Sequence, residues 1–346
     1  MNLRKFWSYL RSEQRPRPEP SSDPSLLSVI RLPDDIQWPI GVAIGSTLFV
    51  RPSQELIHNE IFLGYLNRLI CPRHVSTGST EGYIILGNPG IGKSASLNYQ
   101  LYMASEFDVN VVVQHGEDCT YMFHKDGTVD LWSGTATKMC RELVDSPETL
   151  FLFYPDRTNA QAGLTAAYTV VASSPDDRHY SQIADSPHMK TRWMFGWTLE
   201  ELKLAHESLQ PNRLLTDDQV ADIEERYREL GGSLQWSMRP AAHFHDILAR
   251  RRANLFNITL NDIRQYLGAI LEQRGLTKRE EPSSRYDPFM IFHCFPPRKN
   301  SYLPYSLGYA SEKTQKMVEA YLDLKTDDAW REYLRILNAF TGGLHS

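Results

Sequence analysis

The sequence of 346 residues has few cysteines and no long apolar run. Its four cysteines, Cys71, Cys119, Cys140 and Cys294, lie far apart without a CxxC pair, so neither a zinc site nor a disulfide framework is predicted. No stretch approaches the roughly 20 apolar residues that cross a bilayer, and the first residues contain no apolar run of signal-peptide length. We therefore expect free thiols in a reducing compartment and no membrane span.

A large excess of one charge is also absent. The net charge is −5, with 41% hydrophobic and 23% charged residues, which is ordinary for a globular protein of cytoplasmic type. This balance gives no general reason to expect a nucleic-acid or acidic-membrane partner. The locally basic run at residues 250–252 is a candidate DNA contact, with a solvated helix face as the simpler interpretation.

The distribution of residue types predicts three parts. Residues 1–35 end in a stretch rich in proline, serine and charge, which predicts a disordered or linker arm. Residues 36–212 contain short, continuous apolar runs that alternate with helical patterns, as in a parallel sheet covered by helices on both faces. Residues 213–346 are mostly helical in pattern. The predicted fold is α/β, with a parallel sheet followed by a helical lid and C-terminal domain.

Periodicity and turn residues place the individual elements. Strands are predicted within residues 38–50 and at 83–86, 110–114, 149–154, 168–172, 192–196 and 288–295, with a hairpin at 121–132. Helices are predicted at residues 54–69, 94–105, 198–208, 216–230, 240–249, 260–274, 311–322 and 327–340.

One motif carries specific chemistry. The segment Gly87-Asn88-Pro89-Gly90-Ile91-Gly92-Lys93-Ser94 satisfies G-x-x-x-x-G-K-[ST] in full, between a predicted strand and a predicted helix that includes Ala95. Its glycines allow backbone amides to approach phosphate oxygens, and the helix directs its positive dipole end at them. Lys93 is the candidate to neutralise the β- and γ-phosphates, and Ser94 the candidate ligand of Mg²⁺. The predicted ligand is a nucleoside triphosphate, ATP with Mg²⁺.

Two further strand ends supply polar candidates. Asp156 follows the apolar run TLFLFY and is the candidate to hold the metal through its water shell. Arg157 stands where many ATPases have a second carboxylate that orients water, so no general base is evident and hydrolysis is predicted to be slow or absent. Ser173 and Ser174 end the next apolar run and are candidate sensors of the γ-phosphate.

The order of these segments resembles a known family. The segments that carry the resemblance are LGNPGIGKSAS, VVVQH, the strand before Asp156, VVASSP, WTLEEL at 197–202 and RYRELGGS at 226–233. With these segments the chain looks like the P-loop NTPase module of Crinkler effectors, which is shared with trypanosome retrotransposon hot spot proteins. The segment YSLGYASEKTQKMVEAYL at 305–322 resembles the end of that module. The resemblance covers most of residues 45–340, and the phosphate loop is its specific part.

The resemblance implies an ATPase of the AAA+/STAND type whose lid carries G-G-x-P-R. Here Gly231, Gly232 and Ser233 match, whereas Leu234 and Gln235 replace the proline and arginine. Two other residues are therefore the candidate lid arginines: Arg226 and Arg239. The resemblance further implies an effector secreted into a host and a homo-oligomer that completes the site with a neighbour's arginine. The ubiquitin-like header and the nuclease or kinase domain of many relatives are not evident here.

Four functions are compatible with this pattern. The first is an ATP-driven switch that changes a surface for a protein or nucleic-acid partner. The second is an NTPase that turns over, and the third is a pseudo-ATPase that uses nucleotide as a structural ligand in an interaction module. The absent second carboxylate at Arg157 favours the first or the third. A small-molecule or nucleoside kinase is the fourth, and the arginines do not favour it.

Overall fold

The computed structural model describes residues 2–41, 45–70, 80–155, 160–174, 179–210 and 214–257, and the segments 292–295, 306–309 and 311–323. The chain divides into two compact units. The sheet unit comprises Met1–Leu86 and Gly92–Arg192, and the helical unit comprises Gly87–Ile91 and Trp193–Ser346. This change of unit at residues 192–193 precedes the boundary at 212 that the sequence pattern suggests, because the segment from Trp193 onward packs with the helices.

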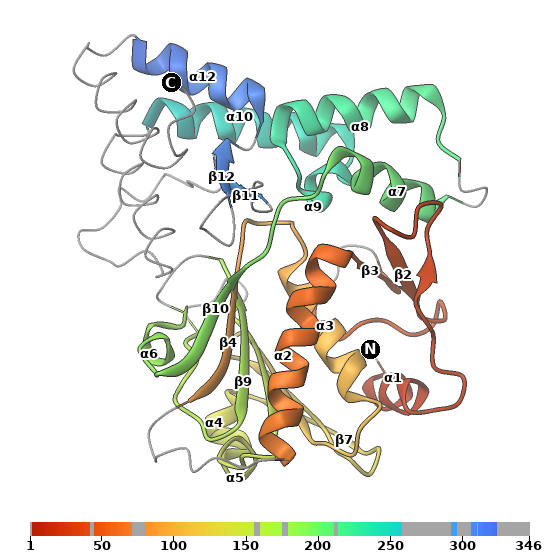
Figure 1. Ribbon diagram of the computed structural model, residues 1–346, viewed down its shortest axis with the longest axis vertical. Coiled ribbons are helices and arrows are strands. Elements are labelled where there is room, and N and C mark those ends of the chain that lie inside the picture. Colours follow the sequence, from red (N-terminus) through yellow and green to blue (C-terminus); the bar gives the residue numbers. More distant parts are fainter. Residues whose placement is uncertain are drawn as a thin grey trace. The chain divides into compact units, whose positions relative to one another are not determined.

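The sheet unit is built on a seven-stranded sheet in the order β10-β4-β9-β8-β5-β6-β7 (Figure 1). The strands are β4 Glu81–Leu86, β5 Val111–His115, β6 Cys119–Phe123, β7 Val129–Ser133, β8 Leu150–Tyr154, β9 Tyr168–Ser173 and β10 His188–Trp193. Strands β4, β9, β8 and β5 are parallel to one another, and β6 and β7 continue the sheet as antiparallel strands. The predicted α/β fold class with its parallel sheet is confirmed.

The continuous apolar runs became strands because both sheet faces are covered. Phe151, Leu152, Phe153, Val170 and Val171 are at most 1% exposed, so side chains on both faces of β8 and β9 are buried. The predicted hairpin also forms, with its turn at Gly127 (φ +90°) between β6 and β7. The strand predicted at 192–196 instead spans His188–Trp193.

Helices α2 (Pro52–Ile70) and α3 (Lys93–Ala104) pack side by side on the central strands (Figure 1). Helix α3 contacts β8 and β9, and α2 contacts β4. The other helices of this unit are α1 Leu3–Leu10, α4 Ala136–Met139, α5 Arg141–Val144 and α6 Ser181–Ala184. The predicted helices at 54–69 and 94–105 are confirmed. No described helix has the length and apolar character needed to cross a membrane.

The N-terminal segment differs from its predicted form. Residues 11–35 include β1 (Glu19–Pro20) and β2 (Ser28–Arg31), which join β3 (Thr47–Val50) in a separate antiparallel sheet. Leu27, Val29 and Ile30 are at most 1% exposed. The prolines and charges suggested an arm without a core, but these few apolar residues find partners on β3, which lies far along the chain.

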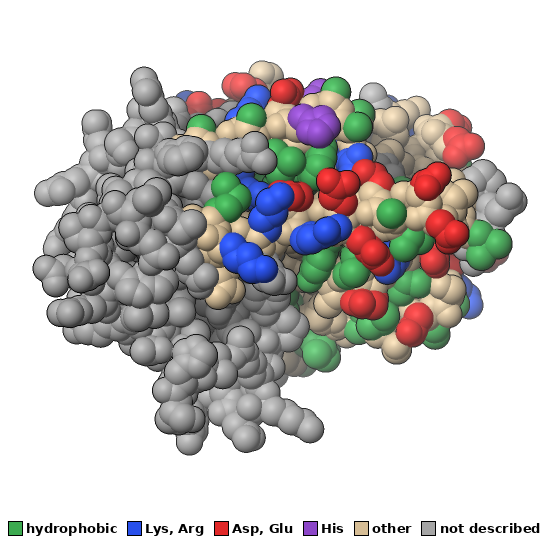
Figure 2. Space-filling view, turned by 90° about the horizontal axis from the view of Figure 1, so that it is seen from above, with side chains coloured by type: hydrophobic (Ala, Val, Ile, Leu, Met, Phe, Trp, Pro, Cys, Tyr) green, Lys and Arg blue, Asp and Glu red, His purple; other side chains and the backbone are tan. Residues whose placement is uncertain are grey.

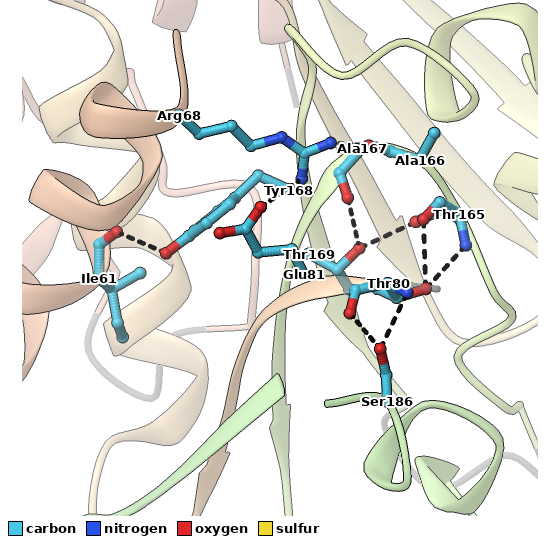
Figure 3. A network of polar contacts seen from close by, with 10 residues as sticks. All are labelled: Ile61, Arg68, Thr80, Glu81, Thr165, Ala166, Ala167, Tyr168, Thr169 and Ser186. Carbon is cyan, nitrogen blue, oxygen red and sulfur yellow. Dashed lines mark hydrogen bonds and ion pairs between the residues drawn. The ribbon is translucent and has the colours of Figure 1, made fainter. Parts of the chain in front are cut away.

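A polar network lies at the sheet edge where β4 and β9 begin (Figure 3). The Thr80 hydroxyl accepts from Thr165 N at 3.0 Å and donates to Thr165 O, while the hydroxyls of Thr165 and Thr169 lie 2.9 Å apart. Ser186 accepts from Thr80 N at 3.1 Å, and Arg68 pairs with Glu81 at 3.5 Å. These contacts join the residues before β4, β9 and β10 to one another at the end of the strands opposite the phosphate loop.

The helical unit contains α7 Leu199–Leu209, α8 Asp217–Leu230, α9 Leu234–Ser237, α10 Ala241–Asn257 and α12 Glu312–Asp323, with the strand pair β11 Phe292–Phe295 and β12 Ser306–Tyr309. The predicted helices at 198–208, 216–230, 240–249 and 311–322 are confirmed, and the strand predicted at 288–295 is confirmed over β11; residues 288–291 lie outside the described residues. The helices predicted at 260–274 and 327–340 lie outside the described residues.

Capping boxes begin α7 and α8. In each helix the N-cap threonine, Thr198 or Thr216, accepts from the backbone of Glu201 or Gln219, whose side chain accepts from the threonine N–H. Both helices therefore begin where the sequence pattern indicates. Figure 2 shows many acidic side chains on the described surface of this unit, with a smaller group of lysines and arginines beside them.

Candidate phosphate-binding site

The loop Gly87–Ser94 lies at a strand-to-helix junction, as predicted. Strand β4 ends at Leu86, and α3 begins at Lys93. Strands β4, β9, β8 and β5 are parallel, so their carboxyl ends lie at the same end of the sheet. The loop leaves the sheet at this end. Ligands of open α/β sheets bind at this end.

Two glycines give the loop a backbone shape that other residues disfavour. Gly90 has φ +78° and Gly92 has φ +109°, both in the left-handed region. A Cβ atom at Gly90 would also lie 2.3 Å from Ser233 Oγ and 2.8 Å from Gln235 Cβ. The first half of the loop is therefore in close contact with residues of the same helical unit, and any side chain at Gly90 would disturb both.

The N-terminus of α3 is open to an anion. Its N-cap residue is Gly92, which has no side chain and therefore makes no capping hydrogen bond to the first turn of this 12-residue helix. Such groups are satisfied by water or by a ligand, and they carry the positive end of the helix dipole. Lys93 and Ala95 lie in this first turn, and Lys93 is 9% exposed.

The Ser94 hydroxyl is held by the segment that precedes β3. It donates to the Gly41 carbonyl at 3.0 Å, which leaves its oxygen lone pairs available to a cation. The same segment is fixed to α3 by Asn98, whose amide accepts from Ile40 N at 3.2 Å and donates to Ile40 O at 2.7 Å. Asn98 is fully buried, so residues 40–41 have a defined position beside the helix.

Ser173 ends β9 directly beside the strand that enters the loop. It pairs in register with Leu86, the last residue of β4, and is 1% exposed. Its hydroxyl has no hydrogen-bond partner among the described residues. A buried hydroxyl without a partner is costly and suggests a missing ligand or water. Asp156, the predicted metal residue, lies outside the described residues, two positions after Tyr154 at the end of β8.

The two candidate lid arginines, Arg226 and Arg239, differ in their surroundings. Arg226 is 6% exposed, pairs with Asp222 at 2.8 Å and lies over the Phe244 ring at 5.1 Å. It also donates to the carbonyls of Ser237 and Arg239. Arg226 therefore joins α8 to the end of α9, and the structure gives it a packing role. Arg239 is exposed.

The basic run at 250–252 is not a uniform solvated face either. Arg251 is 1% exposed and donates to Glu229 Oε2 at 2.9 Å. The guanidinium of Arg251 is therefore paired inside the helical unit. The central residue of the basic run does not face solvent, where a DNA contact would need it. The helical periodicity of α10 could have indicated that one of three consecutive arginines faces inward.

Strand order and loop together define the class of this fold. The strand that carries the complete G-x-x-x-x-G-K-[ST] loop lies between two other strands of the sheet, and a helix begins at the lysine of the loop. This arrangement is a P-loop NTPase fold.

No family model matches the sequence, and no curated protein matches it. The chain is similar to solved structures of two mutants of RuvB from Thermotoga maritima. One has a TM-score of 0.32 and 10% identity, covering 65% of each chain. The other has a TM-score of 0.35 and 11% identity, covering 77% of this chain and 95% of that chain. The overlap is slight, so the fold assignment rests on the strand order and the loop.

Proposed function

We propose that this chain binds ATP with Mg²⁺ through the loop Gly87–Ser94. The observation that carries the proposal is the complete loop between the end of β4 and the uncapped start of α3. Gly90 and Gly92 have the positive φ angles that turn successive amides toward one anion. The residues present fit a polyphosphate, since N–H donors, a lysine and a hydroxyl are contributed by one continuous segment.

Each residue then has a defined role. The backbone from Gly87 through Asn88, Pro89, Gly90, Ile91 and Gly92 to Ala95 surrounds the phosphates. Lys93 neutralises the β- and γ-phosphates, Ser94 coordinates Mg²⁺, and Asp156 holds the water shell of the metal. The buried Ser173 hydroxyl has no hydrogen-bond partner within the described part of the chain, which supports a contact with the γ-phosphate or its attacking water, because β9 ends beside β4.

Calorimetric titration with ATP, ADP and GTP, with and without Mg²⁺, tests the proposal. Wild type should bind ATP at micromolar concentration or tighter, and Lys93→Ala should weaken binding at least 100-fold because a charge-assisted phosphate contact is lost. Lys203→Ala is the matched control, since Lys203 pairs with Glu224 on the surface of the helical unit. A Lys93→Ala variant that binds ATP as tightly as Lys203→Ala would refute the site.

We further propose that nucleotide binding operates a switch in a Crinkler-like NTPase module. The order of the segments from the phosphate loop to residue 322 supports this interpretation. The output would be an altered surface for a protein or nucleic-acid partner, in a homo-oligomer that supplies an arginine to its neighbour. On this view the chain acts as an effector in a host cell.

The alternative is a pseudo-ATPase that retains nucleotide as a structural ligand of an interaction module. The observation that favours it is Arg157, which follows Asp156 where a water-orienting carboxylate is usual. A single-turnover assay with labelled ATP separates the two. Release of labelled phosphate within minutes supports the switch with hydrolysis, whereas ATP that stays intact on the protein for hours supports the pseudo-ATPase.

A further inference from the structure

Three successive carbonyl groups of the phosphate loop accept hydrogen bonds from the helical unit to which they belong. Ser233 Oγ donates to Pro89 O at 3.3 Å, and Gln235 N donates to Gly90 O at 3.2 Å. The indole Nε1 of Trp197 donates to Ile91 O at 3.0 Å. The donors come from two segments, one before α7 and one at the start of α9.

This pattern determines where the loop amides point. The described peptides are all trans, so the C=O and N–H of each peptide point in opposite directions. With the carbonyls of Pro89, Gly90 and Ile91 directed at the helical unit, the amides of Gly90, Ile91 and Gly92 point away from it. Successive amides that point to the same side form an anion-binding concavity.

The indole donor is itself held firmly. Trp197 is 2% exposed, and its backbone N donates to Gly232 O at 2.9 Å. A Cβ atom at Gly232 would lie 2.0 Å from Trp197 O, so only glycine permits this approach. Gly232 precedes Ser233 directly, and the two donor segments are therefore joined to each other as well as to the loop.

We propose that Trp197, Ser233 and Gln235 form a carbonyl clasp that holds the phosphate loop in its anion-binding conformation. Trp197 is the principal positioning residue, because its bond is the shortest of the three and its donor side chain is buried. The inference rests on the proposed function, and it adds that affinity for the polyphosphate depends on residues that do not touch it. By linkage, a bound polyphosphate must stabilise the clasp to the same extent.

The first experiment observes the indole directly in the full-length protein. The Trp197 Nε1–H resonance, assigned by its loss in Trp197→Phe, should shift when ATP with Mg²⁺ is added. Pyrophosphate with Mg²⁺ should produce a similar shift, because the clasp acts on the loop that holds phosphates. A resonance that does not move during saturation with either ligand would contradict the clasp.

The second experiment compares two tryptophan variants by calorimetry. Trp197→Phe retains an aromatic ring but removes the indole N–H that donates to Ile91 O, so affinity for ATP and for pyrophosphate should both fall about tenfold. Trp236→Phe is the matched control, since Trp236 is 7% exposed and packs with Leu230 and Phe244 in the same unit. Its affinity should stay within about twofold of wild type.

The outcomes separate this inference from the proposed function. If wild type binds ATP in a Lys93-dependent manner and Trp197→Phe binds as tightly as Trp236→Phe, the clasp is refuted and the phosphate site stands. If wild type binds neither ATP nor pyrophosphate, both proposals fall. Ser233→Ala provides a second variant with little risk to folding. It should weaken binding about two- to threefold, because its bond to Pro89 O is the longest of the three.

Discussion

The central strands of the sheet unit and the helices around α8 bury different chemistry. Strands β8 and β9 bury consecutive apolar side chains, such as Phe151, Leu152 and Val170. The helical unit buries a charged cluster as well, in which Glu229 is paired with Arg251 at 2.9 Å and with Lys313. Apolar burial is non-directional, whereas buried charges must each retain a partner. The helical unit should therefore depend more on individual side chains.

The largest effect is expected from Glu229→Ala. The side chain of Arg251 is 1% exposed, and this change removes the carboxylate that neutralises it. We expect the free energy of unfolding to fall by about 3–5 kcal/mol in urea titrations, the usual loss when one partner of a buried ion pair is removed.

The double variant Glu229→Leu with Arg251→Leu should lose less than this single variant, because no buried charge then lacks a partner. A double variant that is less stable than Glu229→Ala would contradict the contrast between the two interiors.

Leu152→Ala tests the sheet interior. Leu152 is fully buried on β8, so truncation leaves a cavity between the strand and its covering elements. The expected loss is about 2–4 kcal/mol of unfolding free energy. Leu152→Met, which preserves volume, should cost less than about 1.5 kcal/mol, since the apolar contacts remain. Similar losses for both variants would show that shape outweighs apolar volume in this sheet.

Acidification sharpens the comparison, because each unit contains a histidine whose pKa is lowered mainly by burial. Burial, with Arg51 nearby, lowers the pKa of His58 in the sheet unit to about 3. Burial, with Arg226 opposed by Asp222, lowers the pKa of His206 in the helical unit to about 4. Both imidazoles are neutral when folded but take up a proton near pH 6.5 when unfolded. The stability that each neutral histidine contributes is therefore fully present above about pH 6.5. It is lost as the pH falls from there toward the pKa of the folded state.

Urea titrations between pH 7 and 4 measure this loss, which reaches about 3 kcal/mol for His206 at the acid end. His206→Gln should flatten the pH dependence of the helical unit over that window and leave the contribution of His58 unchanged. An unaltered slope in His206→Gln would mean that other groups cause the acid sensitivity.

The smallest effect is expected at a helix cap. Thr216→Ala removes the oxygen that accepts from Gln219 N at the start of α8, at an expected cost of about 1 kcal/mol. Thr216→Ser keeps the acceptor and should remain within about 0.5 kcal/mol of wild type. Thermal unfolding of both variants gives the comparison. Equal losses would show that the threonine methyl group, and not the capping bond, is what stabilises the helix.

Elements with a strong local signal were predicted well. The runs at 149–154 and 168–172 became β8 and β9, because short, continuous apolar runs fit parallel strands that are buried on both faces. The helices predicted at 198–208 and 216–230 likewise became α7 and α8. The arm at 11–35 was predicted less well, because its proline and charge content conceals the few apolar residues that pair with β3.

The sequence alone located the phosphate loop, because the glycines, lysine and serine of the motif lie within one continuous segment. Only the tertiary structure decided which distant groups surround it. Within the sheet unit, strand register places Ser173 beside Leu86, and the Gly41 carbonyl accepts from Ser94. Within the helical unit, the indole of Trp197 donates to Ile91 O. Tertiary packing also gave Arg226 and Arg251 internal partners. Contacts between residues a hundred positions apart leave no periodic signal in the chain, because each depends on the whole fold around it.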